Sequence, residues 1–376
     1  MYISVLVYSM MMFVMYLCGK GSLYFRPYRY WLYGFAILVF VVISGIRYDV
    51  GVDFMTYHGI FSSFTSDSGN LNLAMLYNER YESGFLGIVS LLSKLGFGPQ
   101  GIFAAFAFLQ IVIIYYIFKD YTSILPYIGI TLIAGGEYFM WMNAIRQIVV
   151  FAFFLLTIQS IYKKKYIQAV VFVICALLMH KSAVIFLPFL FCIPLLQKGI
   201  LNVKYQLFIL LCSLILSNLQ IWQYFTDLIE SILSVLGDFG ERYSADGVMD
   251  VNSELDFGIR ALIQLVLNVI AIVFSHKMFL PLTNNNRLMV IFYNMFFIGS
   301  VLSLLFADNH ALSRFVLYFS SISFIIYAFL LAYLSSHKSK YSHVLKYAVL
   351  ILLFIYFYRT LQADNGTASI LYKVYF

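Results

Sequence analysis

The chain has 376 residues, of which 62% are hydrophobic and 11% are charged, with a formal net charge of +7 and a mean hydropathy of +0.89. A water-soluble domain carries about 25% charged residues to cover its surface, so this composition excludes a soluble globular fold. In lipid the backbone must satisfy its hydrogen bonds internally, and the continuous apolar runs favour helices over a β-barrel. We therefore predict an all-α polytopic membrane protein.

About twelve apolar segments are predicted to cross the bilayer as helices. In chain order they are residues 2–18, 31–46, 101–118, 123–139, 143–162, 166–180, 181–196, 205–219, 258–274, 288–306, 314–334 and 347–359. The first lacks a basic start and a small-residue cleavage site, so we expect a span and not a signal peptide. No repeat or linker divides the chain, which predicts a single integral membrane domain over residues 1–376.

The basic residues predict the orientation, because lysine and arginine in short loops mark the cytoplasmic side. Fourteen of the 24 basic residues fall in loops that this rule places inside, together with one of the 17 acidic residues, Asp120. Both ends of the chain are then outside, as are two long loops at about residues 47–82 and 218–257. Within the second loop, residues 221–239 have apolar positions at helical spacing, which predicts an amphipathic helix on the outer leaflet.

Residues 83–96 form an apolar segment of about 14 residues that tests this topology. Counted as a full span, it would invert everything downstream and place the triplet Lys163–Lys165 outside. Apolar segments of this length are more often re-entrant or interfacial than spanning. We therefore predict a re-entrant helix that enters the membrane from the external side.

The first group of candidate site residues follows the second predicted span, which ends at Arg47. If the chain continued as a helix, Asp49, Asp53 and Tyr57 would share one face. Gly51 provides a position at which that helix can break and the backbone can approach a ligand. Two interpretations stay open: a carboxylate held near a cation in a surface cleft, and an ion pair that sets the depth of the helix.

Two further groups lie near predicted helix ends. Asn143, Arg146 and Gln147 stand one turn apart on one helical face, and together they offer a dense set of donors for phosphate or sugar hydroxyls. A plain alternative is an arginine that extends to the membrane surface from just inside the span. His180 and Lys181 form a polar turn between two apolar segments, which suits either a helical hairpin or a histidine facing an anion.

The last group begins the predicted span at residues 314–334. His310, Arg314 and Tyr318 recur at intervals of four residues, and Arg260 and Glu82 also fall on the external side. Several cations at one membrane face suggest an anionic ligand that resides there, such as a lipid pyrophosphate, although attraction to anionic headgroups would give a similar pattern. The five predicted external cations are Arg47, Arg146, Lys181, Arg260 and Arg314.

Common cofactor and catalytic signatures are missing from the sequence. It contains no P-loop, no His-Glu-x-x-His, no Gly-x-Ser-x-Gly and no paired cysteines. We therefore expect no cofactor, no nucleotide and no nucleic-acid partner. A metal is not required if arginine carries the positive charge, although one acid pair could hold a divalent ion.

Four short segments in order resemble the EpsG/Wzy-type polysaccharide polymerases of bacterial surface-glycan pathways. They are Arg47–Tyr57 (R-x-x-x-G-x-D-x-x-x-Y), Tyr81–Phe85 (YESGF), Asn143–Gln147 (NAIRQ) and His180–Ala183 (HKSA). A later Arg314-Phe-x-x-Tyr318 also fits. In terms of this resemblance Asp53 is the motif acid, and Phe54 stands where the family commonly has tyrosine.

The resemblance implies an enzyme, a membrane glycosyltransferase of the bacterial inner membrane with its active face outside. It would transfer a glycan chain from polyprenyl pyrophosphate to a lipid-linked repeat unit in O-antigen, capsule or exopolysaccharide synthesis, with membrane lipid and a chain-length regulator as further partners. We expect Asp53 or Glu82 to act as the base, with His180 as the second choice. Substrate would be bound by Arg47, Tyr57, Asn143, Arg146, Gln147, Lys181, Arg260, His310, Arg314 and Tyr318.

Two other functions remain open. A ligase of the same broad class would move finished glycan onto a lipid acceptor. A polysaccharide transporter or flippase would not be an enzyme, and it would place its charges near the middle of the bilayer.

Overall fold

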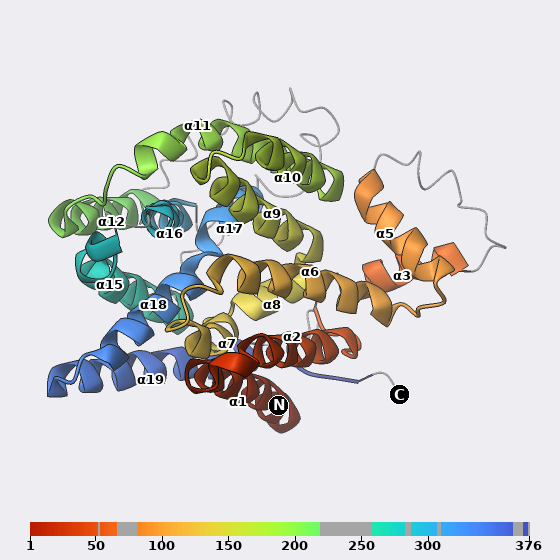
Figure 1. The fold of residues 1–376 in the computed structure, drawn as a ribbon, viewed down its shortest axis with the longest axis horizontal. Helices are drawn as coiled ribbons and strands as arrows, with labels where there is room; N and C mark the ends of the chain where they lie inside the picture. Colours follow the sequence, from red (N-terminus) through yellow and green to blue (C-terminus); the bar gives the residue numbers. More distant parts are fainter. Residues whose placement is uncertain are drawn as a thin grey trace. The chain divides into compact units, whose positions relative to one another are not determined.

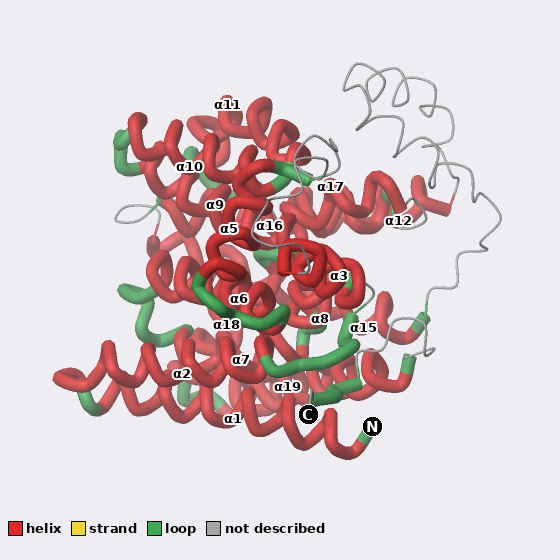
Figure 2. The backbone as a smooth tube through the Cα atoms, turned by 90° about the vertical axis from the view of Figure 1, so that its right-hand side faces the viewer, coloured by secondary structure: helices red, strands yellow, loops and turns green. Residues whose placement is uncertain are grey.

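The computed structural model is helical in nearly all the residues that it describes, which are 1–51, 53–65, 81–218, 258–282, 287–306, 310–363 and 371–374 (Figures 1 and 2). Side chains are described within these ranges except at residues 63–65, 185, 218, 282 and 310–314. Within the described residues, one isolated antiparallel β-bridge pairs Arg47 with Val374.

The described chain groups into two compact units, of which the first comprises Met1–Leu187 and Leu331–Phe376. Its elements are α1 (Tyr2–Tyr24), η1 (Arg26–Tyr28), α2 (Arg29–Gly45), α3 (Phe54–Thr65), α5 (Ser83–Lys94), α6 (Gln100–Phe118), α7 (Leu125–Ala134), α8 (Glu137–Asn143), α9 (Ile145–Tyr162), α10 (Tyr166–Met179), η2 (Lys181–Ile185) and α19 (Lys340–Gln362). This unit contains most of the predicted site residues.

The second unit comprises Pro188–Leu330. Its elements are α12 (Val203–Asn218), α15 (Ile259–Phe279), η4 (Leu280–Leu282), α16 (Leu288–Leu305) and α17 (His310–Ser320), while α11 (Phe186–Leu196) and α18 (Ser323–Ser336) belong to both units. Hydrogen bonds join its apolar helices at buried positions: Tyr293 on α16 donates to Gln206 on α12, and Tyr327 on α18 donates to Asn268 on α15. Such bonds satisfy polar groups that apolar surroundings would otherwise penalise.

The prediction of an all-α polytopic membrane protein is confirmed. Eight helical segments of the described residues are long and apolar enough to cross a membrane: Tyr2–Tyr24, Arg26–Gly45, Gln100–Phe118, Ile145–Tyr162, Ile259–Phe279, Leu288–Leu305, Phe315–Ser336 and Lys340–Gln362. Shorter apolar helices occupy the other predicted segments. The count of about twelve spans, their orientation and the single-domain organisation stay predictions.

One predicted span is divided in the structure. Residues 123–139 were expected to form a continuous helix, but α7 ends at Ala134 and α8 begins at Glu137. Gly136 between them has φ +87°, a left-handed conformation that glycine adopts without steric cost and that a helix cannot contain. A second break at Ala144 then separates α8 from α9, so Asn143 ends one helix while Arg146 and Gln147 begin the next, and the three do not share one helical face as predicted.

The predicted re-entrant segment forms α5, which has 12 residues. A helix of this length is about 18 Å long, against a hydrocarbon thickness of about 30 Å, so it is too short to span. It packs on α3, α6 and α10. Its place in the bilayer stays a prediction, and residues 221–239, where we expected an amphipathic helix, lie outside the described residues.

Two glycines bring the site-bearing helices close together. A Cβ atom on Gly45 would lie 2.9 Å from the Cβ of Ala104, so α2 can pack tightly on α6 only without a side chain there. A Cβ on Gly84 would lie 2.7 Å from both the Cβ and the carbonyl oxygen of Leu178. The start of α5 therefore lies against the end of α10, which places Glu82 beside Lys181.

Candidate functional site

An ion pair joins three segments of the first unit that are far apart in the sequence. Nη1 of Arg146 donates to Oε2 of Glu82 over 2.5 Å, and the backbone N–H of Lys181 donates to Oε1 of the same carboxylate over 2.8 Å. The side chains of Arg146 and Glu82 are 14% and 9% exposed. Both carboxylate oxygens thus accept a hydrogen bond in a place largely shielded from solvent.

Helices begin at each of the three segments. Glu82 directly precedes α5, Arg146 lies in the first turn of α9, and Lys181 begins η2, which continues into α11. The start of a helix carries partial positive charge and unpaired N–H groups, so it favours an anion and disfavours a cation. Because Arg146 adds a full positive charge at such a position, the arrangement requires an anion, and Glu82 supplies it.

Aromatic rings surround the guanidinium of Arg146. Its Cζ atom lies 5.1 Å from the ring centroid of Tyr81 and 5.2 Å from that of Phe85. Tyr57 on α3 packs edge-on against Phe85, with ring centroids 5.8 Å apart. Burial raises the pKa of Tyr57, and the nearby charge of Arg146 opposes the rise. The phenol of Tyr57 therefore stays protonated at neutral pH and can act as a hydrogen-bond donor.

Asp53 directly precedes α3 and is exposed. Its backbone carbonyl accepts from the N–H of Tyr57 over 3.1 Å, so the two residues are one helical turn apart. The continuous helix that would have aligned Asp49, Asp53 and Tyr57 on one face is not present, because Asp49 and Gly51 have φ values of +51° and +102° and α3 begins afterwards. The break expected at Gly51 is present.

Arg47 is buried in the same unit, with 1% of its surface exposed. Its Nη2 donates to the carbonyl of Met142 over 2.8 Å, and its Cζ lies 4.8 Å from the ring centroid of Phe103 and 5.9 Å from that of Phe54. Burial lowers the pKa of Arg47 to about 10, which leaves the guanidinium charged at neutral pH. A cation that binds a carbonyl at the end of α8 stabilises the negative end of that helix.

Gly51 lies directly against Asn143. A Cβ at Gly51 would be 2.2 Å from Oδ1 of Asn143 and 3.4 Å from the carbonyl oxygen of Met142. Together with the bond from Arg47 to Met142, this contact fixes the end of α8, three residues before Arg146. The predicted first and second groups therefore meet in the structure.

We predict that Gly51→Ala displaces Asn143 and strains the backbone. The left-handed φ alone costs about 1–2 kcal/mol for a residue with a Cβ, and the clash adds to this cost. The variant should lower the thermal unfolding temperature of the purified protein and reduce its activity. Gly59→Ala is the matched control, since Gly59 lies within α3 and nothing lies within 4 Å of its added Cβ. Equal behaviour of the two variants would contradict the close contact.

The remaining predicted residues of the first unit differ in exposure. Nδ1 of His180 accepts from the backbone N–H of Ser182 over 3.2 Å and also contacts its hydroxyl over 2.7 Å. An accepting Nδ1 places the proton of the neutral ring on Nε2, so the histidine is oriented as a donor. Lys181 has an exposed side chain, whereas Gln147 is buried in the first turn of α9.

Four predicted residues belong to the second unit. Arg260 is exposed in the first turn of α15, and Tyr318 on α17 is fully buried. His310 and Arg314 are part of α17, but their side chains lie outside the described part. The predicted convergence of Arg260 and Arg314 with the cations of the first unit stays a prediction.

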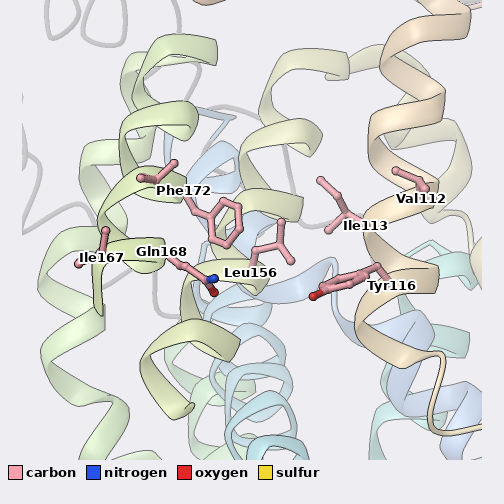
Figure 3. Close-up of a pocket in the computed structure, with 8 residues that line it drawn as sticks. Val112, Ile113, Tyr116, Leu156, Ile167, Gln168 and Phe172 are labelled. Atoms are coloured by element: carbon pink, nitrogen blue, oxygen red, sulfur yellow. The ribbon is translucent and has the colours of Figure 1, made fainter. Parts of the chain in front are cut away.

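An apolar pocket of about 470 Å³ lies between α6, α9 and α10 in the first unit. Figure 3 shows Phe172 and Gln168 of α10 beside Leu156 of α9, with Ile113 and Tyr116 of α6 opposite them. Leu156 is ten residues along α9 from Arg146, or about 15 Å at the rise of an α-helix. The full lining comprises Val112, Ile113, Tyr116, Leu156, Ile167, Gln168, Val171 and Phe172.

Several contacts of the site were not foreseen. Tyr81 and Phe85 belong to a segment that carries the resemblance, yet neither was predicted to contact Arg146. The signal that could have indicated this contact is that both are aromatic residues close to Glu82 in the sequence. Phe103 and Met142 carry no such signal, because an apolar side chain and a backbone carbonyl are common everywhere. Among the residues that the structure describes, no group of three or more His, Cys, Asp or Glu is placed to hold a metal ion.

The model of the EpsG family matches residues 30–375, a range that includes both compact units. No curated protein and no solved structure matches the chain. The family match covers more than half of the chain and agrees with the ordered motifs and with the helical membrane architecture. The chain therefore belongs to the EpsG family, a family of polysaccharide polymerases, and is a multi-pass membrane protein.

Proposed function

We propose that the protein is an oligosaccharide repeat-unit polymerase. It transfers a growing glycan from polyprenyl pyrophosphate to a lipid-linked repeat unit at the outer face of the bacterial inner membrane. The observation that carries the proposal is the Arg146–Glu82 pair at the starts of three helical segments. Such a place favours an anion, and in the structure the carboxylate of Glu82 occupies it.

The pyrophosphate of the donor binds where the Glu82 carboxylate lies. Its oxygens accept hydrogen bonds from the guanidinium of Arg146 and from the N–H of Lys181, the two donors that Glu82 uses in the structure. A guanidinium suits this task because its fork of N–H groups matches phosphate oxygens. The displaced Glu82 carboxylate then becomes available to accept a proton.

The reaction is a substitution at the anomeric carbon of the growing chain. A hydroxyl of the non-reducing sugar of the new repeat forms a bond to this carbon, while the bond from the carbon to the pyrophosphate oxygen breaks. The proton of the hydroxyl passes to Asp53 or Glu82, with His180 as the second choice, and the electron pair leaves with the pyrophosphate. Arg146 stabilises the negative charge that develops there, and the sugar passes through an oxocarbenium-like state.

The other side chains orient the substrates. Asn143, Gln147 and Tyr57 offer hydrogen bonds to sugar hydroxyls next to Arg146. We assign Arg47 an indirect contribution, because it is buried against Met142 and holds the segment that carries Asn143. Further contacts with the lipid-linked substrates are proposed for Lys181, Arg260, His310 and Arg314, whereas Tyr318, which is fully buried, is assigned an indirect contribution like that of Arg47.

The apolar pocket supports a lipid-linked substrate. It lies along α9, the helix that begins with the Arg146 site, and its lining is mostly hydrocarbon (Figure 3). A ligand with an anionic head and a long apolar tail requires both kinds of surface on one unit. A soluble nucleotide-sugar would require no apolar pocket of this kind.

Extension of a defined lipid-linked repeat by the purified protein tests the function directly. We expect a ladder of products, each one repeat longer than the last, together with released polyprenyl pyrophosphate. If the purified protein forms no glycosidic bond when it is given the lipid-linked repeat, that result would exclude a polymerase and favour a transporter. Glycan profiles of cells lacking the protein separate the polymerase from a ligase: loss of a polymerase leaves single repeats on the acceptor, and loss of a ligase leaves long chains unattached.

A further inference from the structure

We infer that residues Leu371–Val374 are part of the functional site, as a segment that positions the loop of Arg47 and, through it, Asn143. The segment is named here the C-terminal strap. It is more than 300 residues from Arg47 in the sequence, and nothing in its composition indicates a role. Its effect on catalysis rests on the proposed function, whereas its docking and its effect on Asn143 do not.

The strap pairs with the loop that follows α2. Val374 forms an antiparallel bridge with Arg47, and the backbone N–H of Tyr48 donates to the carbonyl of Lys373 over 2.9 Å. Nζ of Lys373 also donates to Oδ2 of Asp49 over 3.1 Å. These contacts bind the three consecutive loop residues Arg47, Tyr48 and Asp49, and the bond from Tyr48 satisfies a backbone N–H that lies outside any helix.

Tyr372 anchors the strap to α1 and α2. Its side chain is buried, and its hydroxyl donates to the carbonyl of Ile43 in the last turn of α2 over 2.9 Å. Its backbone N–H donates to Oγ of Ser4 on α1 over 2.9 Å, and its ring meets that of Tyr8 edge-on at 5.6 Å. The strap is therefore held by a buried aromatic residue and not by exposed charges alone.

The loop transmits this position to the candidate site. Arg47, paired with Val374 through its backbone, uses its side chain to bind the carbonyl of Met142. Gly51, four residues on, packs against Oδ1 of Asn143. Both contacts act on the last residues of α8, just before the break at Ala144 that begins α9 and Arg146. A shift of the strap should therefore move Asn143 relative to Arg146.

A zero-length cross-link tests the docking without any assay of activity. A carbodiimide joins a carboxylate to an amine only when the two are in contact, and the Asp49 and Lys373 side chains are 42% and 50% exposed, so the reagent can reach them. We expect mass spectrometry of the full-length protein to detect the peptide of Asp49 joined to that of Lys373. The Lys373→Gln variant should lose this product. Its absence from the wild-type protein would overturn the docking.

Thiol reactivity tests the transmission to the site. In a protein whose native cysteines are replaced by serine, Asn143→Cys should react slowly with a water-soluble maleimide. Adding Tyr372→Phe removes the hydrogen bond to Ile43, and we expect the rate to rise several-fold. Tyr358→Phe is the matched control, because Tyr358 is exposed on α19 of the same unit. An unchanged rate with Tyr372→Phe would overturn the positioning of Asn143.

Turnover of the otherwise unmodified enzyme separates positioning from stability. Tyr372→Phe should lower kcat about fivefold, with KM for the lipid-linked donor changed less than about twofold, the scale expected for losing one neutral hydrogen bond. The thermal unfolding temperature should stay close to that of Tyr358→Phe. A fall in unfolding temperature with kcat unchanged would show that the strap only stabilises the fold. If the wild-type protein forms no polymer, the proposed function fails, and the two measurements above still decide the docking and the positioning.

Discussion

Replacing Arg146 with alanine is expected to abolish long glycan chains while the protein remains in the membrane. In the proposed reaction the guanidinium of Arg146 stabilises the negative charge that develops on the leaving pyrophosphate. Loss of one such donor typically lowers the rate about 100- to 1,000-fold, because the charge then develops in a poorly solvated place without a partner. The measurement is the chain-length distribution of surface glycan in cells that carry the variant, together with turnover of the purified protein.

Two further variants make this test specific. Arg146→Lys keeps the charge but loses the planar fork, so it should restore part of the activity. Arg359→Ala is the matched control, since Arg359 is exposed on α19 and donates to Gln362 on its own helix over 3.3 Å. It should leave the glycan unchanged. Normal chain length with Arg146→Ala would end the catalytic proposal.

Replacing Glu82 with alanine is expected to have the largest effect on stability. The change leaves the guanidinium of Arg146 in a largely enclosed place at the start of α9 without a counter-ion, and it removes the acceptor of the Lys181 N–H. Removing one partner of a buried ion pair costs about 3–5 kcal/mol. The purified variant should therefore unfold at a clearly lower temperature in detergent.

A double-mutant cycle checks that this cost belongs to the ion pair. Glu82→Ala combined with Arg146→Ala should be less destabilised than the sum of the two single variants, by about 1–3 kcal/mol, because the double variant leaves no unpaired charge. Additive effects would show that the two side chains do not depend on each other. Glu82→Gln, which keeps an acceptor for the Lys181 N–H, should fall between the wild-type protein and Glu82→Ala.

Most of the helices could be predicted because their signal is local. A run of apolar residues favours a helix in lipid whatever the rest of the chain does, and all twelve predicted segments contain helical structure. The breaks were harder to predict. Residues 123–139 divide at Gly136, in a Gly-Gly pair followed by Glu137, a local turn signal that the apolar average over the whole segment hides. Composition over a window therefore identifies a membrane helix but does not locate a change of direction within it.

The candidate site was predictable in its residue types and less so in its pairings. Glu82, Arg146 and Lys181 were singled out because charges next to apolar segments are costly. Which charges meet was not predictable, since Glu82 and Arg146 are 64 residues apart and their contact depends on the close packing of Gly84 against Leu178. For Arg47 the sequence indicated a site at the membrane surface, and the fold places it in the interior against Met142.

The sequence by itself determined three things about this protein. Its apolar composition indicated that it lies in a lipid bilayer, the need to satisfy backbone hydrogen bonds in lipid indicated helices, and the short ordered motifs indicated the family. The tertiary structure alone decided that Glu82 lies between Arg146 and Lys181, that Gly51 contacts Asn143, and that Lys373 returns to Asp49. The physical reason is the distance over which each interaction acts. Burial in a bilayer acts on each segment separately, whereas a hydrogen bond or an ion pair requires two groups within a few ångströms, and helix packing sets that distance.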